Sequence, residues 1–308
     1  MNGIVVIDKP EGRTSYDVVR EVCKILKARK AGHTGTLDPM ATGVLPVCIN
    51  EATKLVQFLS GDSKDYRATM LLGVETDTQD IEGRVLSTCE PAVREGDIET
   101  ALRNCLGTME QIPPRYSAVK VQGKALYHWA RKGIPVARPA RTVEIHRLAL
   151  LNVQWPYVTF DVCCSKGTYI RSLCADLGER LGSKACLAGL RRTRSGRFQE
   201  RDAVSIEDLK RRGAVPEGRW VSMADALSGY SSIPVDEQMA AKLKDGHQPF
   251  AGDFQENNIP SLDRGDMVKF MLGHETLVAV GEMLHASKEW PALNRKERFA
   301  RIVRIFNH

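Results

Sequence analysis

Residues 32–46 read Gly-His-Thr-Gly-Thr-Leu-Asp-Pro-Met-Ala-Thr-Gly-Val-Leu-Pro, and the interpretation of the whole chain depends on this stretch. Neither a helix nor a strand period runs through it. Its three glycines allow backbone conformations that are closed to other residues. Pro39 restricts Asp38 to an extended conformation, so the carboxylate stands on a stiff, non-helical support. From the local pattern alone, an Asp-Pro pair of this kind is most often part of a turn.

The size and composition of the chain are those of an ordinary globular protein. It has 308 residues, of which 43% are hydrophobic and 27% charged. This length predicts about two domains and a full hydrophobic core. The 44 Lys and Arg residues exceed the 38 Asp and Glu residues by six. Such a small excess favours a polyanionic partner only where the cations cluster.

The eight cysteines are scattered and include no C-x-x-C pair. This pattern predicts buried thiols in a reducing compartment, with neither a disulfide framework nor a zinc site. The N-terminus carries Asp8 and Lys9 within its apolar start, which is not typical of a signal peptide. All apolar runs are too short to span a membrane. We therefore expect a cytoplasmic protein.

Hydrophobic periodicity predicts an α+β protein. Thr14 is expected to cap a first helix, Asn50 a second, and Ser205 a short later one. A further helix is expected directly after residues 165–168, with Tyr169 and Arg171 in its first turn. The Ser-, Gly- and Tyr-rich stretch 227–234 is interpreted as a linker to a small β module. Strands are expected at 4–7, 44–49, 66–72, 142–150, 158–164, 267–272, 276–280 and 301–306.

Segment 111–141 differs in composition from its surroundings. It has no acidic residue and seven basic ones: Arg115, Lys120, Lys124, Arg131, Lys132, Arg138 and Arg141. Tyr116, Tyr127, His128 and Trp129 are interleaved with these cations. Cations meet phosphates and rings stack on bases, so the pattern favours an RNA-binding excursion. The alternative is a solvated insertion without a ligand.

The 32–46 stretch resembles the catalytic loop of the B-type tRNA pseudouridine synthases, G-H-x-G-x-L-D-P-x-A-x-G-x-L-P, and fills every fixed position of it. This resemblance implies that Asp38 is a nucleophile. It also implies that His33 supports the RNA where the target base leaves the stack.

Further motifs along the chain resemble the same family. Residues 64–67, Lys-Asp-Tyr-Arg, resemble a motif whose tyrosine, here Tyr66, stacks on the target base. Residues 165–173 resemble a motif in which Arg171 pairs with the aspartate and Tyr169 lines the pocket. Residues 190–192 match the segment that closes the pocket with a leucine, here Leu190. We also expect Lys64, and Asp80 at the end of the polar loop 76–80, to bind substrate.

The resemblance implies a pseudouridine synthase fold, in which helices flank a large mixed or antiparallel sheet. The catalytic domain is expected at 1–229, with 111–141 as its RNA-gripping insertion. A small, mostly β module resembling a PUA domain is expected at 233–308.

The implied reaction converts a uridine of the tRNA T-arm stem-loop, uridine-55, into pseudouridine. The base must first be extruded, and one nucleophilic carboxylate can then form a covalent intermediate. No metal or nucleotide cofactor, no obligatory protein partner and a monomeric state are expected. Two alternatives remain open at this point: a guide-RNA-dependent pseudouridine synthase, and a non-catalytic RNA-binding or RNA-folding protein.

Overall fold

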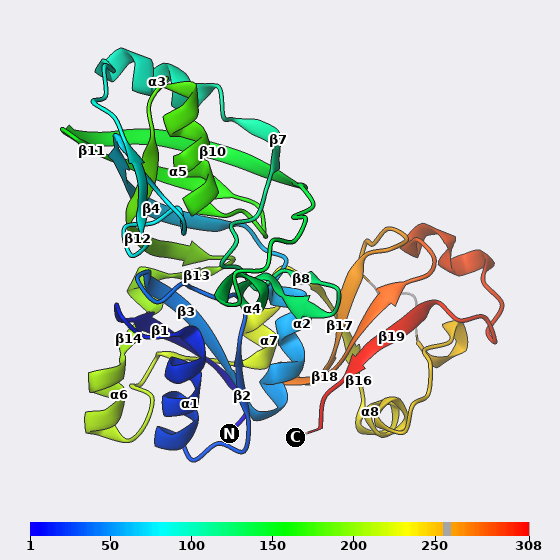
Figure 1. The fold of residues 1–308 in the computed structure, drawn as a ribbon. Coiled ribbons are helices and arrows are strands. Elements are labelled where there is room, and N and C mark those ends of the chain that lie inside the picture. Colours follow the sequence, from blue (N-terminus) through cyan, green and yellow to red (C-terminus); the bar gives the residue numbers. More distant parts are fainter. Residues whose placement is uncertain (255–259, 308) are drawn as a thin grey trace.

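The computed structural model describes residues 1–254 and 260–307, which form two main sheets and two small hairpins (Figure 1). The larger sheet has eleven strands. Its strands, in spatial order, are β14 (Val204–Ser205), β1 (Gly3–Lys9), β3 (Thr42–Ile49), β12 (Ala185–Ser195), β4 (Lys64–Leu72), β11 (Tyr157–Cys164), β10 (Arg141–Gln154) and β7 (Gly107–Gln111). Three short strands pair at its side: β2 (Ala31–His33) with β3, β13 (Phe198–Gln199) with β12, and β15 (Trp220–Val221) with β1.

One half of this sheet is antiparallel and is covered by two helices. Strand β4 pairs with β11 on one side and β12 on the other, both antiparallel. Burial along β4 alternates as predicted, with Tyr66 and Met70 facing the core. Helices α3 (Glu95–Arg103) and α5 (Ile170–Arg180) cover that face, and both contribute side chains to the same core cluster (Figure 1).

The other half packs against helices α1 (Ser15–Ile25) and α6 (Ile206–Arg212). The predicted caps of both helices are confirmed, since Thr14 accepts from the backbone N–H of Asp17 and Ser205 from that of Asp208. The prediction that Asn50 caps a helix is wrong. Asn50 has a φ of 52°, and its Oδ1 accepts from the backbone N–H of Arg29, so it begins the 3₁₀ helix η1 (Asn50–Leu55) without capping it.

The two halves meet where β3 runs parallel to β12. Only two residue pairs form this join, Thr42 with Arg191 and Gly43 with Arg192. Gly43 has a φ of +98°, and a Cβ at this position would lie 2.3 Å from the carbonyl oxygen of Arg192. Glycine is therefore required by both the backbone conformation and the close approach. Because β2 ends at His33 and β3 begins at Thr42, loop 34–41 is held directly beside this join.

Segment 111–141 is folded and anchored to the larger sheet's lobe. It forms a hairpin of β8 (Lys120–Val121) and β9 (Lys124–Ala125), followed by α4 (Leu126–Arg131). Val119 is 6% exposed and Leu126 1%. The anchored part therefore belongs to the body of the protein, while its cations remain at the surface.

The smaller sheet has the order β16 (Ser231–Val235), β17 (Met267–Leu272), β18 (Thr276–Met283) and β19 (Ala300–Ile305), with α8 (Glu237–Lys244) beside it. The three strands predicted in this region are confirmed. The predicted linker at 227–234 is wrong, because Ile233 lies in β16 and is fully buried, and Leu227 is only 3% exposed.

The two sheets share one buried cluster. Met271, Val280 and Phe306 from the smaller sheet's lobe pack with residues of β1, β3 and the short helices α2 (Val56–Leu59) and α7 (Met223–Ala226). The remaining elements are β5 (Val74–Thr76), β6 (Val85–Thr88), η2 (Glu200–Asp202), η3 (Ala251–Asp253) and η5 (Ser287–Ala292). Among the described residues, no helix is both long and apolar enough to cross a membrane.

Candidate active site

A cavity of about 340 Å³ opens at the join of the two sheet halves. Residues 34–38 and residues 165–171, which lead into α5, form most of its lining. The remaining lining comes from Ser60, Lys64, Tyr66, Ser117, Ala118, Leu190 and Arg192. The fold therefore gathers most of the predicted site residues, although they are spread over more than 150 positions of the chain.

Asp38 and Arg171 meet at this cavity. The Nε of Arg171 lies 2.9 Å from Oδ2 of Asp38. The Arg171 side chain is only 5% exposed, whereas that of Asp38 keeps 37% exposure toward the opening. The predicted pairing is thus present as a close ion pair between a buried cation and an accessible carboxylate.

The guanidinium of Arg171 is shared among several partners. One terminal nitrogen, Nη1, donates to the carbonyl of Thr78 at 3.1 Å, and Nη2 donates to that of Tyr116 at 2.9 Å. Only Nε faces Asp38, and its angle is too poor for a hydrogen bond. Arg171 therefore pairs with Asp38 through one nitrogen and does not grip it in a bidentate manner.

The surroundings of Asp38 make its carboxyl harder to ionise than usual. Burial raises its pKa, and the neighbouring Asp80 carboxylate adds to this rise. Arg171 and, more weakly, Lys9 act in the opposite direction. The net direction is upward, so Arg171 only partly offsets the cost of placing the charge among protein atoms.

Asp80 lies behind Arg171 and does not line the cavity. It is 5% exposed, and its Oδ2 is 3.4 Å from Nη1 of Arg171. Its other oxygen accepts from the hydroxyl of Thr78 at 2.6 Å. This geometry suits a residue that supports Arg171, and the predicted role of Asp80 in substrate binding stays a prediction.

Two buried cations that the sequence reasoning missed hold the loop on either side of Asp38. The Nζ of Lys9 donates to the carbonyls of Pro39 at 3.0 Å and Ala41 at 2.6 Å. Burial lowers the pKa of Lys9 to about 8. Arg192, which is 1% exposed, donates to the carbonyls of Gly35 and Val44 at 3.0 and 2.7 Å.

Both predicted tyrosines reach the cavity. Tyr66 stands on β4 with 9% exposure, and burial raises its pKa, so its phenol is neutral near pH 7. Tyr169 is the N-cap residue of α5. The buried Gln111 side chain fixes its backbone, accepting from its N–H at 2.7 Å and donating to its carbonyl at 3.0 Å. Gln111 was also missed by the sequence reasoning.

The other predicted residues differ in their access to the cavity. Leu190 lines it from β12. Lys64 also lines it, but its ammonium donates to the carbonyls of Ser60 and Asp62 at 2.8 and 2.5 Å. His33 ends β2 and lies outside the lining, and its Nδ1 has no hydrogen-bond partner.

Buried polar atoms without hydrogen-bond partners gather at this site. Among the described residues they are Nδ1 of His33, Oγ1 of Thr34, Oγ of Ser117 and Nε of Arg171. Thr34, Ser117 and Arg171 line the cavity, and His33 adjoins Thr34. The Nε of Arg171 is compensated by its ion pair with Asp38, whereas each of the other three atoms leaves a penalty of about 1–3 kcal/mol, and such a concentration is typical of a functional site.

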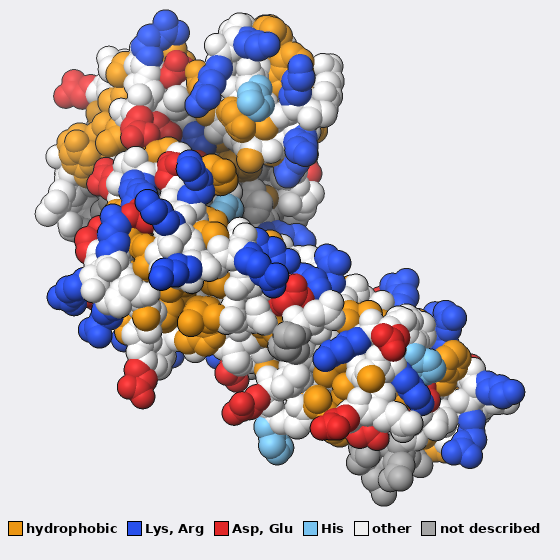
Figure 2. Space-filling model, turned by 90° about the horizontal axis from the view of Figure 1, so that it is seen from below, with side chains coloured by type: hydrophobic (Ala, Val, Ile, Leu, Met, Phe, Trp, Pro, Cys, Tyr) orange, Lys and Arg blue, Asp and Glu red, His pale blue; other side chains and the backbone are white. Residues whose placement is uncertain are grey.

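The wider surface gives less information. Lys and Arg side chains are spread over both lobes on the face shown in Figure 2 and form no single patch there. In the described part of the chain, no group of three or more His, Cys, Asp or Glu residues is placed to hold a metal ion.

Comparison with known proteins gives matches along the chain. The model of the TruB family pseudouridylate synthase N-terminal domain matches residues 23–170, and that of the tRNA pseudouridylate synthase B C-terminal domain matches residues 171–218. The tRNA pseudouridine synthase B of Syntrophus aciditrophicus is 52% identical, with 100% of this chain and 99% of that protein covered. The synthase of the same name from Clostridium tetani is 44% identical over 80% of this chain and 85% of its own length.

Solved structures are similar as well. A Cbf5-Nop10-Gar1 complex contains a chain with a TM-score of 0.76 and 30% identity, which covers 99% of this chain and 85% of its own length. An H/ACA RNP bound to a substrate RNA containing 2′-deoxyuridine contains a chain with a TM-score of 0.74 and 28% identity. The match covers 99% of this chain and 85% of that one.

Proposed function

The chain belongs to the TruB family of pseudouridylate synthases and isomerises uridine in tRNA, and we propose that its target is uridine-55 of the T-arm stem-loop, with Asp38 as the nucleophile. The observation that carries the residue assignment is the accessible carboxylate of Asp38, 2.9 Å from the buried guanidinium of Arg171. Both line the cavity that also contains Tyr66, Tyr169 and Leu190.

The proposed reaction is a rearrangement within one nucleotide. The N1–C1′ bond breaks, the base turns, and a C5–C1′ bond forms. C5 loses its proton and N1 ends protonated, so nothing is oxidised or reduced. One nucleophilic carboxylate can hold the fragments together through a covalent intermediate. Because the target base is stacked in a folded loop, it must be extruded before Asp38 can reach it.

Each neighbour of Asp38 has a proposed part. Arg171 favours the ionised carboxylate and aims it. The aromatic rings of Tyr66 and Tyr169 hold the extruded base, and Leu190 closes the cavity over it. Lys9 and Arg192 keep the loop in place through its carbonyls. His33, at the edge of the site, supports the RNA strand from which the base departs.

We further propose that the chain acts alone on tRNA as a monomer. The smaller sheet's lobe, 233–308, holds the RNA away from the reacting base in the manner of a PUA domain, and 1–229 carries the chemistry. The location of the protein in the cytoplasm stays a prediction.

The test replaces Asp38 by Asn, which keeps its size and removes its charge. Purified wild-type protein should form pseudouridine in a bare T-arm stem-loop, and Asp38→Asn should form none while binding the RNA within a few-fold of wild type. Turnover by Asp38→Asn above a trace of the wild-type rate would refute the assignment. Mapping pseudouridine in total tRNA from cells with and without the protein tests the target position.

The similarity to Cbf5 chains supports a second candidate, a synthase that needs a guide RNA and protein partners. The same assay separates the two. Activity of the purified chain on the bare T arm favours the stand-alone enzyme, and activity that appears only when guide RNA and partner proteins are added favours the alternative.

A further inference from the structure

Gln111, the last residue of β7, directs its side-chain amide at the backbone of one other residue, Tyr169. Its Oε1 accepts from the Tyr169 N–H at 2.7 Å, and its Nε2 donates to the Tyr169 carbonyl at 3.0 Å. Gln111 is only 2% exposed. Because an amide has both a donor and an acceptor, it can hold both polar groups of one residue, which fixes the orientation of that residue as well as its position.

The backbone of Tyr169 needs such a support because it lies outside the helix that follows it. Tyr169 is the N-cap residue of α5, with an extended backbone (φ −101°, ψ 109°), and its side chain makes no capping hydrogen bond. Its N–H precedes the hydrogen-bond ladder of the helix, so no helical carbonyl is available to it. Its ring lines the catalytic cavity. Gln111 therefore supplies, from another element, a bond that the helix cannot give.

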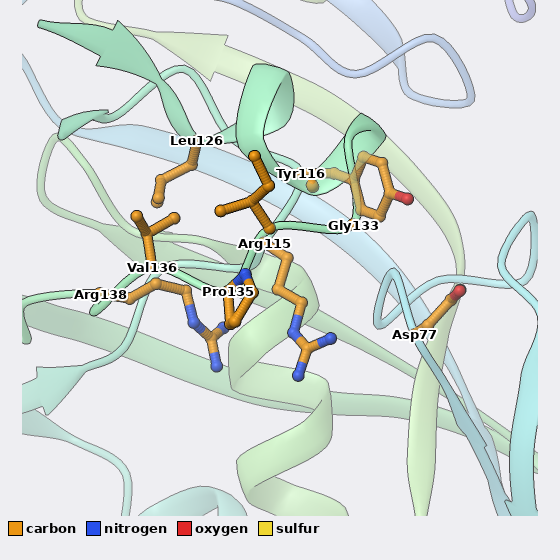
Figure 3. A pocket seen from close by; sticks show the side chains of 10 residues that line it. Asp77, Arg115, Tyr116, Leu126, Gly133, Pro135, Val136 and Arg138 are labelled. Atoms are coloured by element: carbon orange, nitrogen blue, oxygen red, sulfur yellow. The ribbon is translucent and has the colours of Figure 1, made fainter. Parts of the chain in front are cut away.

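Two more bonds join the same stretch of chain to the start of α5. The carbonyl of Ile112 accepts from Oγ of Ser172 at 3.0 Å, and the carbonyl of Tyr116 accepts from Nη2 of Arg171 at 2.9 Å. On another side, Tyr116 borders a second cavity of about 310 Å³, where open space takes the place of packed protein (Figure 3). The contacts with α5 therefore hold this stretch, and Gln111 is its buried end.

We infer that Gln111 is a positioning residue of the reaction: its amide sets the place of the Tyr169 ring against the extruded base, and so controls the rate of the chemical step. The inference rests on the proposed function, in which that ring holds the base. Burial raises the pKa of the Tyr169 phenol, and the nearby Ser117 hydroxyl opposes this rise, so the ring is neutral near pH 7. A neutral ring contributes by where it lies, and a displacement of about 1 Å at a reacting centre can cost about 100-fold in rate.

The first test removes both bonds and keeps the shape of the side chain. Gln111→Met has nearly the same length and lacks both polar atoms. We expect its single-turnover rate on a T-arm stem-loop to fall about 10- to 100-fold, with RNA affinity within a few-fold of wild type. In a Tyr169→Ala background, which has no ring to position, Gln111→Met should change the rate little further. Such non-additivity identifies Tyr169 as the residue through which Gln111 acts.

The second test makes the two bonds depend on pH. In Gln111→Glu, a protonated carboxyl group has a donor and an acceptor, as the amide does, whereas a carboxylate has acceptors only and repels the Tyr169 carbonyl. Burial raises the pKa of such a carboxyl. The rate of Gln111→Glu, divided by the wild-type rate at the same pH, should therefore be near one at low pH and fall as the pH rises.

A purely electrostatic effect of the new carboxylate on Asp38 would act in the opposite sense. A nearby negative charge raises the pKa of Asp38, which lowers the rate on the acid limb and has little effect at high pH, where Asp38 is ionised in any case. The relative rate would then recover as the pH rises. The direction of the pH dependence therefore distinguishes loss of the two bonds from a change of charge.

Met109→Ala is the matched control for stability. Met109 lies two positions earlier in β7 and packs against the same core as Tyr66, but it is not one of the residues that bond to Tyr169. It should lower the melting temperature and leave the single-turnover rate unchanged. All variants are assayed at a temperature at which their thermal melts show the folded state.

A near wild-type rate for Gln111→Met would overturn the inference. So would a rate loss that is fully additive with Tyr169→Ala, or a relative rate of Gln111→Glu that does not fall with rising pH. Pseudouridine formation by wild type on the same stem-loop is measured in parallel. Failure of that reaction counts against the proposed function, whereas wild-type activity with additive cycles counts against this inference alone.

Discussion

At the scale of single residues, Arg171 matters because its three guanidinium nitrogens have three different tasks. One faces Asp38, and the others hold the carbonyls of Thr78 and Tyr116. Lysine keeps the charge but has a single nitrogen, so Arg171→Lys cannot satisfy all three. We expect its single-turnover rate to fall about 100-fold, the loss typical of a misplaced catalytic group, with RNA affinity nearly unchanged. A near wild-type rate would show that the Asp38–Arg171 geometry is not needed.

The raised pKa of Asp38 predicts a pH dependence. A carboxyl whose pKa is raised is protonated, and inactive as a nucleophile, at pH values where an ordinary aspartic acid with pKa about 3.9 is ionised. The pH profile of kcat/KM reports the pKa values of the free enzyme. The midpoint of its acid limb should therefore lie above about pH 3.9. Asp80→Asn removes a like charge, so it should move the acid limb of the pH profile to lower pH. It also weakens the support of Arg171, so the maximal kcat/KM at high pH should fall.

Asp176 provides the control for this experiment. Burial raises its pKa to about 6, but it lies on α5 outside the cavity. Asp176→Asn should leave the position of the acid limb unchanged. A limb that disappears in Asp176→Asn, or that moves to higher pH in Asp80→Asn, would show that Asp38 is not the titrating group.

At the scale of elements, the join between β3 and β12 depends on Gly43. Gly43→Ala would place a methyl group 2.3 Å from the carbonyl oxygen of Arg192 at a φ of +98°. The two penalties together should cost about 2–5 kcal/mol of unfolding free energy and displace the Asp38 loop. Gly32→Ala is the matched control, because a Cβ there meets nothing closer than 3.9 Å. Equal melting temperatures and rates for the two variants would contradict this account.

The sequence predicted those elements whose signals are local. Alternation located β4, and side-chain caps located the starts of α1 and α6. The supports of the site have no such signal. Lys9 bonds to carbonyls about 30 positions away, Gln111 to a residue 58 positions away, and Arg192 to carbonyls about 150 positions away. Nothing in a local pattern distinguishes Arg192 from the other arginines near it.

The prediction of a linker at 227–234 was wrong for a related reason. Small and polar residues at 227–234 suggested an exposed connection. A short strand, however, can be fixed by a single buried side chain that faces the core. Ile233 supplies it, and β16 pairs with β17 over five residues. A composition signal therefore could not distinguish a linker from an edge strand of the next sheet.

At the scale of the whole molecule, the two lobes are joined by apolar packing and by polar contacts. The buried Lys269 ammonium donates to the carbonyls of Ala224 and Leu227, and Lys54 donates to the carbonyl of Ile305. Removing the smaller lobe would expose the apolar surface it covers. A chain truncated near Ser232 therefore cannot be relied on to separate RNA affinity from chemistry, and point substitutions are the better test.

Two phenylalanines of the smaller lobe allow that test. Both are fully buried, but Phe306 packs in the cluster shared by the lobes, whereas Phe299 packs within the smaller lobe, 5.0 Å from Trp290 between ring centroids. Each change to Ala should cost about 3–5 kcal/mol. Unfolding is followed in denaturant with versions that keep only Trp220, in the larger sheet, or only Trp290, in the smaller lobe.

Wild type should give coincident transitions at the two tryptophans, because the shared cluster makes the lobes unfold together. Phe306→Ala weakens that coupling and should separate the transitions, with Trp290 unfolding first. Phe299→Ala leaves the shared cluster intact and should lower both transitions without separating them. If Phe299→Ala separates them and Phe306→Ala does not, the cohesion of the molecule comes from elsewhere, and the lobe that is proposed to hold the tRNA is an independent unit.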